Sequence, residues 1–290
     1  MKRVLVTGAN GFIGKAVMDA LYGSDWETIP LVRKSAGLPN EVIADLCNPD
    51  LGMALNSLQR IDAIVHFGAA IGWGDISREI LFKTNVWATS ELADWANKRG
   101  AYLLFASMAT VCGAKNTSIK SDSKLNLDTD YAYSKWLAEE AIKRSNVKHA
   151  IMRIAGVFGR RGPYHLGINK AIDDALAGIP PIQHGDGGVK RNYIYVKDLA
   201  HIVKFCIENE IVGTHLIAGS RIDTVAEMLQ TICDILLPGS RPERREGAKA
   251  YDQIIAHSEG LPRGRSFKEA IMDIKYNSKD ISNKLSAAGR

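Results

Sequence analysis

Cysteine is scarce in this sequence, and its few cysteines are scattered. The 290 residues include four of them, Cys47, Cys112, Cys206 and Cys233, which lie far apart and form no C-x-x-C pair. This spacing is unlike that of a disulfide framework or a zinc site, so we expect neither disulfides nor a bound metal. Free thiols persist most simply in a reducing compartment, which favours the cytoplasm.

Long hydrophobic runs are also missing. No segment has the roughly 18 consecutive apolar residues that a membrane-spanning helix needs. The N-terminus carries two basic residues, Lys2 and Arg3, but glycines interrupt the apolar residues that follow, which is unlike a signal peptide. We therefore expect a protein that does not enter a membrane.

Charge of one sign does not dominate either. The net charge is +5, from 37 Lys and Arg residues against 32 Asp and Glu residues. The densest basic cluster, residues 241–245, is short and is typical of a solvated loop rather than of a nucleic-acid surface. We therefore expect no nucleic-acid partner, while the mild positive balance suits anionic small molecules.

Short apolar segments alternate along the chain with amphipathic ones. Strands are expected at residues 4–6, 28–32, 41–46, 61–67, 101–106 and 150–154, and helices at 12–21, 77–99, 131–144 and 197–209. The apolar residues of 61–67 show little alternation, as in a strand that is buried on both faces. This succession predicts an α/β fold with a doubly wound parallel sheet of the Rossmann type.

The N-terminal sequence MKRVLVTGANGFIG is the most informative segment. A strand-like run leads into three glycines spaced three residues apart, Gly8, Gly11 and Gly14, and a helical pattern follows. Such a turn holds the pyrophosphate of a dinucleotide, because N–H groups and the dipole at the helix start face the anion. Glycine is needed where the turn is tight and where the backbone approaches phosphate. The context therefore predicts an NAD(P) site.

Glycine and proline become frequent after about residue 156, and helical patterns at 171–177 and 224–236 are separated by loops. The segment from Pro238 to Gly264 is polar and is expected to be irregular. Strand-like residues at 193–196 and 215–218 indicate a return to the first domain. We expect an NAD(P)-binding Rossmann domain at 1–155, joined again by 191–219, and a smaller loop-rich C-terminal substrate-binding region at 156–190 and 220–290.

A second signal is the segment Tyr131-Ala-Tyr-Ser-Lys135. On a helix, residues four apart share a face, so Tyr131 and Lys135 point the same way. A free tyrosine, with a pKa near 10, exchanges protons poorly at neutral pH, and a nearby ammonium lowers that pKa. The pair can exchange a proton with an alcohol or carbonyl during hydride transfer. The spacing alone also fits a surface helix, and the upstream glycines give it weight.

The end of the second strand bears on the choice of cofactor. An acidic residue there binds the ribose 2′-hydroxyl of NAD. In this chain Val32 is followed by Arg33 and Lys34, and two cations without an acid favour NADP(H), with NAD(H) possible. In the alternative interpretation, Arg33 is only a solvated charge.

The ordered set of motifs resembles the extended short-chain dehydrogenases/reductases of the NAD(P)-dependent nucleotide-sugar epimerase/dehydratase family. The resemblance spans nearly the whole chain through TGANGFIG, residues 44–46, 66–70, 83–86, 131–135, 153–159 and 185–198. With Arg33, the cofactor-binding residues it implies are Gly8, Asn10, Gly11, Phe12, Ile13, Gly14, Asp45, Leu46, Phe67, Gly68, Ala69, Asn85, Tyr131, Lys135 and Ile154. It further implies that Tyr131 and Lys135 are catalytic and that Arg191 and Arg265 bind the substrate diphosphate.

Two positions depart from the family's pattern. Met108 stands where the family has a catalytic Ser or Thr, and a thioether cannot donate a hydrogen bond to a carbonyl. The hydroxyl is therefore supplied by Thr110 or Ser107, or is absent, and Met108 lies at the substrate. Gly156 stands where some nucleotide-sugar enzymes have an asparagine that contacts the diphosphate, which weakens the assignment to nucleotide sugars.

The resulting expectation is an NAD(P)-dependent oxidoreductase that acts on a hydroxyl or keto carbon of a nucleotide sugar, most simply a 4-keto reductase. The alternatives are a nucleotide-sugar 4-epimerase or dehydratase, a reductase of a non-nucleotide carbonyl, and a non-catalytic NADP(H)-sensing protein. The resemblance also implies a homodimer built on the helices that carry Trp87, Trp95 and Trp136. The alternative is that these side chains are buried within one chain.

Overall fold

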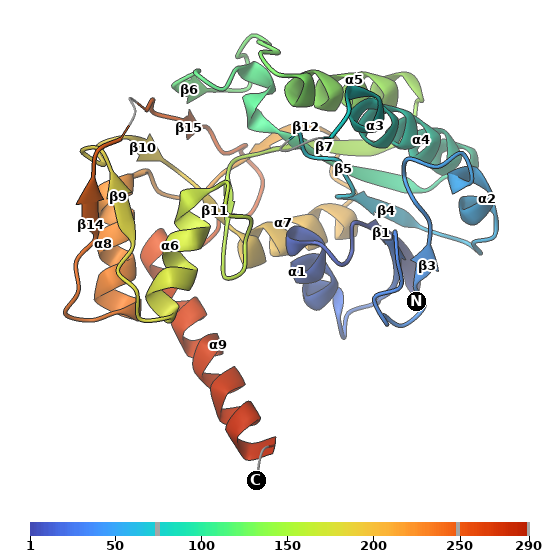
Figure 1. Cartoon of the computed structure of the whole chain (residues 1–290). Coiled ribbons are helices and arrows are strands. Elements are labelled where there is room, and N and C mark those ends of the chain that lie inside the picture. The colour runs from blue at the N-terminus through green and yellow to red at the C-terminus, as the bar shows by residue number, and fades with distance from the viewer. Residues whose placement is uncertain (73–75, 248–249, 289–290) are drawn as a thin grey trace.

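A seven-stranded parallel sheet forms the centre of the molecule (Figure 1). Its strands in spatial order are β12 (Gly213–Ile217), β7 (His149–Ile154), β5 (Tyr102–Met108), β4 (Ala63–His66), β1 (Lys2–Thr7), β2 (Trp26–Val32) and β3 (Val42–Ile43). All neighbouring strands in this sheet run parallel. The computed structural model describes residues 1–72, 76–247 and 250–288.

The chain enters this sheet at its middle. From β1 it proceeds outward through β2 to β3, then returns to β4 on the other side of β1 and continues through β5 and β7 to β12. In such open sheets, ligands bind outside the carboxyl ends of the strands where the order reverses, here between β1 and β4. The architecture is a doubly wound Rossmann fold, and the predicted fold class is confirmed.

Helices cover both faces of the sheet (Figure 1). On one face α1 (Phe12–Leu21) packs against α7 (Val196–Glu208), and on the other α4 (Ala88–Arg99) packs against α5 (Asp130–Arg144). Successive residues of β1 enter different cores: Val4 and Val6 pack on the α1 side, and Leu5 packs on the α4 side. This burial on both faces explains why the central strands are apolar throughout.

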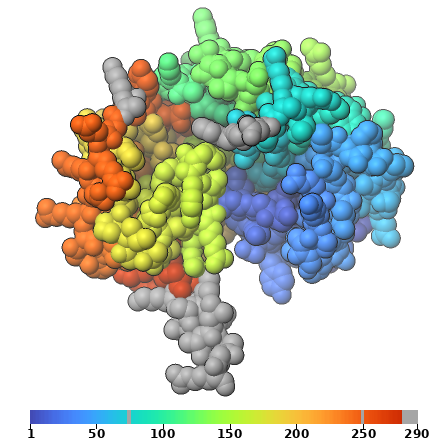
Figure 2. Space-filling view, viewed as in Figure 1, coloured from blue at the N-terminus to red at the C-terminus, as the bar shows by residue number. Residues whose placement is uncertain are grey.

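Further elements lie beside the sheet, most of them drawn in yellow to orange at the left of Figure 2. They comprise α6 (Gly167–Leu176), α8 (Val225–Leu236), α9 (Phe267–Ala288) and the two-stranded pairs β8 (Val157–Phe158) with β11 (Ile194–Tyr195), β9 (Ile182–His184) with β14 (Glu243–Arg245), β10 (Lys190–Arg191) with β13 (Asp223–Thr224), and β6 (Ser118–Ile119) with β15 (Ile254–Ile255). Phe158, Ile172 and Phe267 belong to the same buried cluster as Val4. The core therefore runs without interruption from the sheet into these elements.

Several elements differ from the sequence expectations. The helix expected at 77–99 consists of α3 (Arg78–Phe82), the π-helical turn η1 (Lys83–Trp87) and α4, which ends at Gly100 with a φ of +66°. The patterns revealed neither α2 (Leu51–Asn56) nor the long α9, and the segment expected to be irregular contains β14 and β15. Within the described ranges, the helices are too short or too polar to cross a membrane.

Candidate active site

The glycine-rich turn between β1 and α1 packs closely against the loop after β4. Gly8 has a φ of +66°, and a Cβ on it would lie 2.8 Å from the Gly68 nitrogen. A Cβ on Gly14 would lie 2.1 Å from the Gly8 oxygen. Gly11 is the N-cap of α1 and provides no side-chain cap, so the first N–H groups of the helix remain open for a ligand. This cradle fits the pyrophosphate of a dinucleotide.

A chain of buried hydrogen bonds leads away from this cradle. Thr7 Oγ1 accepts from the Gly68 nitrogen at 3.0 Å and lies 2.6 Å from His66 Nδ1. His66 Nε2 lies 3.0 Å from Thr89 Oγ1, which donates to the Asn85 oxygen at 2.7 Å. Each hydroxyl has one proton, so His66 accepts at Nδ1 and donates from Nε2. Burial lowers the pKa of His66 to about 3, so it is a neutral link that orders the loop.

Asn85 joins this chain to helix α5. Its Oδ1 accepts from the Ala70 nitrogen at 2.8 Å, and its Nδ2 donates to the Ala70 oxygen at 2.9 Å and to Ser134 Oγ at 3.0 Å. Ser134 Oγ donates in turn to the Tyr131 oxygen at 2.8 Å. Asn85 lies on η1, and π turns are frequent at functional sites. Its observed role is therefore to brace the helix that bears Tyr131, while a cofactor contact remains a prediction.

Tyr131 and Lys135 lie in the first half of α5, whose N-cap Thr129 accepts from the Ala132 nitrogen. Lys135 is 4% exposed, and its Nζ lies 4.2 Å from the centroid of the Phe105 ring. Burial lowers the pKa of Lys135 to about 7 and raises the pKa of Tyr131 to about 12. The expected lowering of the tyrosine pKa by the lysine is therefore not found here, because burial dominates both groups.

The two residues considered for the missing hydroxyl, Ser107 and Thr110, have different surroundings. Ser107 is buried, and its Oγ donates to Glu139 Oε1 at 2.5 Å. Its hydroxyl is thus committed away from any substrate. Met108 ends β5, and Thr110 follows on the 3₁₀ turn Ala109–Cys112, where both are partly exposed. Thr110 is therefore the better placed of the two hydroxyls.

Arg191, which was predicted to bind the substrate diphosphate, ends β10 and is partly exposed. Its Nη1 donates to the backbone oxygens of Lys190 at 2.8 Å and of Tyr251 at 2.5 Å.

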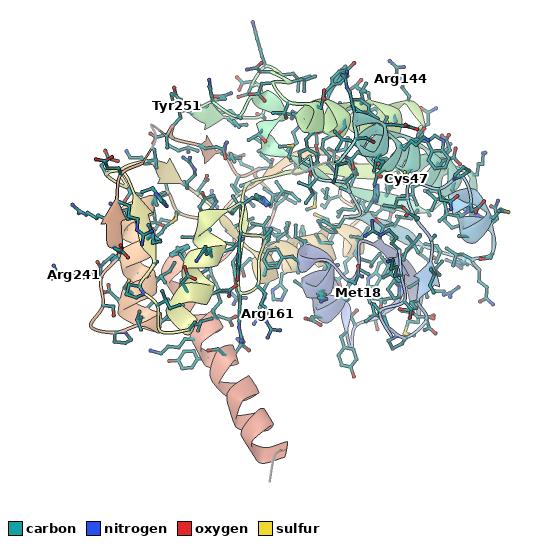
Figure 3. The ribbon with its side chains drawn as sticks, viewed as in Figure 1. Met18, Cys47, Arg144, Arg161, Arg241 and Tyr251 are labelled. Atoms are coloured by element: carbon teal, nitrogen blue, oxygen red, sulfur yellow. The ribbon has the colours of Figure 1, made fainter. Side chains whose placement is uncertain are left out.

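A Cβ on Gly156 would lie 2.6 Å from the Tyr193 ring. The tyrosine thus fills the space that an asparagine at position 156 would need. Tyr251 and Cys47 lie on opposite sides of the view in Figure 3, and Cys47 follows the predicted cofactor residues Asp45 and Leu46.

Arg265 lies in a network of charges between α7 and α9. Its Nε pairs with Asp198 at 2.9 Å and its Nη1 with Asp273 at 3.2 Å. Asp273 also accepts from Tyr195 at 2.8 Å and from Lys197 at 2.7 Å. Two carboxylates already neutralise the guanidinium, so its observed role is structural, and the predicted diphosphate contact is disfavoured.

The other predicted cofactor residues lie along the carboxyl edge of the sheet. Arg33 is exposed immediately after β2. Asp45 Oδ1 accepts from the Cys47 nitrogen at 3.0 Å, and a Cβ on Gly68 would lie 2.4 Å from Leu46 Cδ1. The remaining positions are Asn10, Phe12 and Ile13 at the cradle, Phe67 and Ala69 after β4, and Ile154 at the end of β7.

Sequence reasoning did not single out Glu139, and it included Arg153 only as the first residue of the 153–159 segment, without its pairing to Glu139. Arg153 Nε donates to Glu139 Oε1 at 3.1 Å, and Arg153 Nη2 donates to Glu139 Oε2 at 2.7 Å. The available signal was the position of Glu139, one helical turn beyond Lys135. Its partners on two strands could not be read from that spacing.

The cradle at the switch point and the Tyr131–Lys135 helix are typical of a dinucleotide-binding protein of the Rossmann type. The model of the family described as "NAD dependent epimerase/dehydratase family" matches residues 4–219. The chain belongs to this family.

Individual relatives agree with this membership. The chain is 29% identical over 232 residues to a putative UDP-glucose 4-epimerase of Methanocaldococcus jannaschii, covering 72% of this chain and 75% of that protein. It is 24% identical over 297 residues to UDP-glucuronic acid decarboxylase 1 of Arabidopsis thaliana, covering 90% and 68%.

Solved structures share the fold. UDP-N-acetylglucosamine 4-epimerase from Bacillus cereus superposes with a TM-score of 0.83 at 21% identity, covering 96% of this chain and 97% of that one. UDP-glucuronic acid 4-epimerase from Bacillus cereus, solved in complex with NAD, superposes with a TM-score of 0.77 at 19% identity, covering 95% and 99%.

Proposed function

We propose that this chain oxidises and reduces C4 of a nucleotide-linked hexose, with 4-epimerisation as its net reaction. The observation that carries the proposal is Tyr131 on α5 with Lys135 buried one turn behind it against Phe105. A Cβ on Gly72, in the loop after β4, would lie 3.5 Å from the Tyr131 Cβ, so the helix lies beside the loop that packs on the glycine cradle. Three of the proteins similar to this chain, one curated and two of known structure, are named as 4-epimerases of UDP-sugars, which supports the substrate class.

Four side chains have proposed roles in this reaction. Tyr131 exchanges the proton of the reacting sugar oxygen, and Lys135 holds the nicotinamide ribose. Thr110 donates a hydrogen bond to the same sugar oxygen in place of the hydroxyl that Met108 lacks. Arg191 binds the diphosphate from the opposite side of the site. NAD(P), when bound, supplies the hydride chemistry at the sugar carbon.

A net 4-keto reduction is the second candidate. Arg33 and Lys34 are exposed after β2 and suit the 2′-phosphate of NADP(H), a cofactor that fits net reduction. The solved neighbours in complex with NAD support NAD(H) instead. The direction of the reaction and the cofactor preference are therefore tested together.

Two further interpretations rest on departures from the family pattern. Gly156 permits a reductase of a non-nucleotide carbonyl, and Met108 permits an NADP(H)-sensing protein without turnover. The Tyr131–Lys135 pair argues against the sensor, because binding alone does not need both side chains.

A homodimer remains proposed through the α4–α5 face, where Ser90, Trp136 and Arg144 line a cavity of about 380 Å³. Sedimentation of the purified chain tests this.

The deciding experiment incubates the purified protein with UDP-glucose, UDP-N-acetylglucosamine and UDP-glucuronic acid, and with 4-keto nucleotide sugars. Sugars are followed by NMR and the reduced cofactor by absorbance. Epimerisation converts a sugar with catalytic NAD⁺ or NADP⁺ and no net reduction. A reductase consumes NADPH in step with a new sugar, only with keto substrates.

The control for this assay is Tyr131→Phe, which retains the ring and removes the proton-exchanging oxygen. We expect turnover to fall at least about 100-fold with cofactor binding unchanged. Full activity of the variant would refute the role of Tyr131. No change in any sugar, with cofactor bound, would favour the non-nucleotide carbonyl or sensor interpretation.

A further inference from the structure

Glu139 is a fully buried carboxylate close to the candidate active site. It is 0% exposed and receives hydrogen bonds from Ser107 on β5 and from Arg153 on β7. Ser107 and Arg153 are register partners on these adjacent strands. A buried charge is tolerated only when it is paired and hydrogen-bonded, and here both conditions are met. Glu139 therefore fastens α5 to two strands at once.

The same carboxylate acts on Lys135. The two residues are four apart on α5, so their side chains share one helix face, and the charge of Glu139 favours protonated Lys135 against the effect of burial. Arg153 pairs with this carboxylate from β7. A carboxylate that is paired with a cation attracts a second cation less strongly than an unpaired one does.

The other titratable groups around Lys135 are uncharged at neutral pH. His66 on β4 has a pKa of about 3, and Lys135 is one of the causes of its lowering. Burial raises the pKa of Tyr131 on α5 and of Cys112, which lies beside Arg153 and Glu139 after β5. Phe105 of β5 offers only the face of its ring. Among the charged groups of the described structure, Glu139 is therefore the one that acts on this lysine from close range, and Arg153 is the partner of Glu139.

We propose that Glu139 is a positioning residue that keeps the Lys135 side chain protonated, and that Arg153 restrains it in doing so. The proposal rests on the proposed function only for its consequence, since a charged Lys135 is the form that holds a ribose and supports proton exchange at Tyr131. The protonation itself is a property of the folded chain without substrate.

The test is a pH titration of the full chain labelled with ¹³C at lysine Cε, with the Lys135 resonance assigned by its absence in Lys135→Met. Glu139→Gln is expected to move the midpoint to lower pH by about one unit, the effect of one charge a helical turn away. Arg153→Gln is expected to move it to higher pH, because the carboxylate then faces Lys135 alone. The double variant returns the midpoint toward that of the wild type.

Opposite shifts distinguish this electrostatic role from a structural one, which would loosen the fold in both variants alike. Glu140→Gln is the matched control, because Glu140 adjoins Glu139 but pairs with Lys143 at the surface, and it leaves the midpoint unchanged. Unmoved midpoints, or shifts in the same direction, would overturn the proposal. If Glu139→Gln fails to fold, Arg153→Gln decides alone. The readout needs no substrate, so inactive wild type with shifting midpoints would refute only the proposed function.

Discussion

At the scale of single residues, burial determines the chemistry more than sequence neighbours do. Burial lowers the pKa of His66 and the pKa of Lys135, whereas the equally buried Glu139 is paired with Arg153. Arg265 shows the reverse case, in which a residue expected to meet an anionic substrate meets two carboxylates of its own chain. The role of a charged residue is therefore set by the groups that already surround it.

The neutral state of His66 predicts a pH dependence of stability. In the unfolded chain the histidine has its ordinary pKa of 6.5 and is protonated below that pH, whereas in the folded chain it stays neutral down to about pH 3. Above pH 6.5 this histidine does not lower the free energy of unfolding. As the pH falls from 6.5 to about 3, the free energy of unfolding decreases by about 1.4 kcal/mol per pH unit. Urea titrations at several pH values should give a shallower pH slope for His66→Gln than for wild type. The exposed His201→Gln is the control, and equal slopes for His66→Gln and wild type would contradict the prediction.

Substitutions of the two arginines that were predicted to bind the diphosphate should have different effects, one on stability and the other on substrate binding. Arg265→Ala removes the guanidinium that pairs with Asp198, which is 6% exposed and then keeps only the hydrogen bond from the backbone nitrogen of residue 265, and should lower the free energy of unfolding by about 1–3 kcal/mol. Arg191→Ala should instead raise KM for the nucleotide sugar and leave unfolding nearly unchanged. Chemical denaturation and steady-state kinetics of both variants check this. A large KM effect of a stably folded Arg265→Ala variant would restore its predicted role in substrate binding.

At the scale of elements, the site depends on contacts between segments that are remote in sequence. The turn after β1 touches the loop after β4, and η1 holds both that loop and α5 through Asn85. The interruption of the 77–99 helix by a π turn belongs to this arrangement, since Asn85 lies on that turn. The turn after β1 and the loop after β4 form the cradle, and η1 braces the helix that bears Tyr131.

The cradle predicts a sharp difference between two glycines. Gly14→Ala places a Cβ 2.1 Å from the Gly8 oxygen, which the backbone must move to relieve, so dinucleotide binding should fall at least about 10-fold. Gly167→Ala is the control, because a Cβ at the start of α6 meets nothing within 4 Å. Calorimetric titration with NAD⁺ and NADP⁺ measures both. Equal affinity for Gly14→Ala and wild type would show that the cradle does not hold the dinucleotide.

At the scale of the whole molecule, one core connects the sheet with the C-terminal elements. Phe267, at the start of α9, is 7% exposed and packs on Phe158 with ring centroids 4.9 Å apart. Both belong to the buried cluster that contains Val4 of β1. Unfolding is therefore expected to be cooperative across the two parts of the chain.

Phe267→Ala tests this continuity. Loss of the ring should destabilise the chain by about 3–5 kcal/mol, through lost burial and the cavity left against Phe158. Because the core is shared, far-ultraviolet circular dichroism and tryptophan fluorescence should still report one coincident transition. Separate transitions would indicate that the C-terminal elements unfold on their own. Tyr276→Ala, at an exposed position further along α9, should have little effect.

The sequence by itself determined the Rossmann fold, because strand and helix periodicities and the glycine spacing are local properties of the chain. It also indicated the Tyr131–Lys135 pair, since this needs only a fixed spacing along one helix. Only the tertiary structure decided that Ser107 and Arg265 already have partners, that Tyr193 fills the space beside Gly156, and that burial rather than a neighbouring charge dominates the pKa of Tyr131. These properties depend on which remote residues pack together and on how much water they exclude, and neither is written in the spacing of residues along the chain.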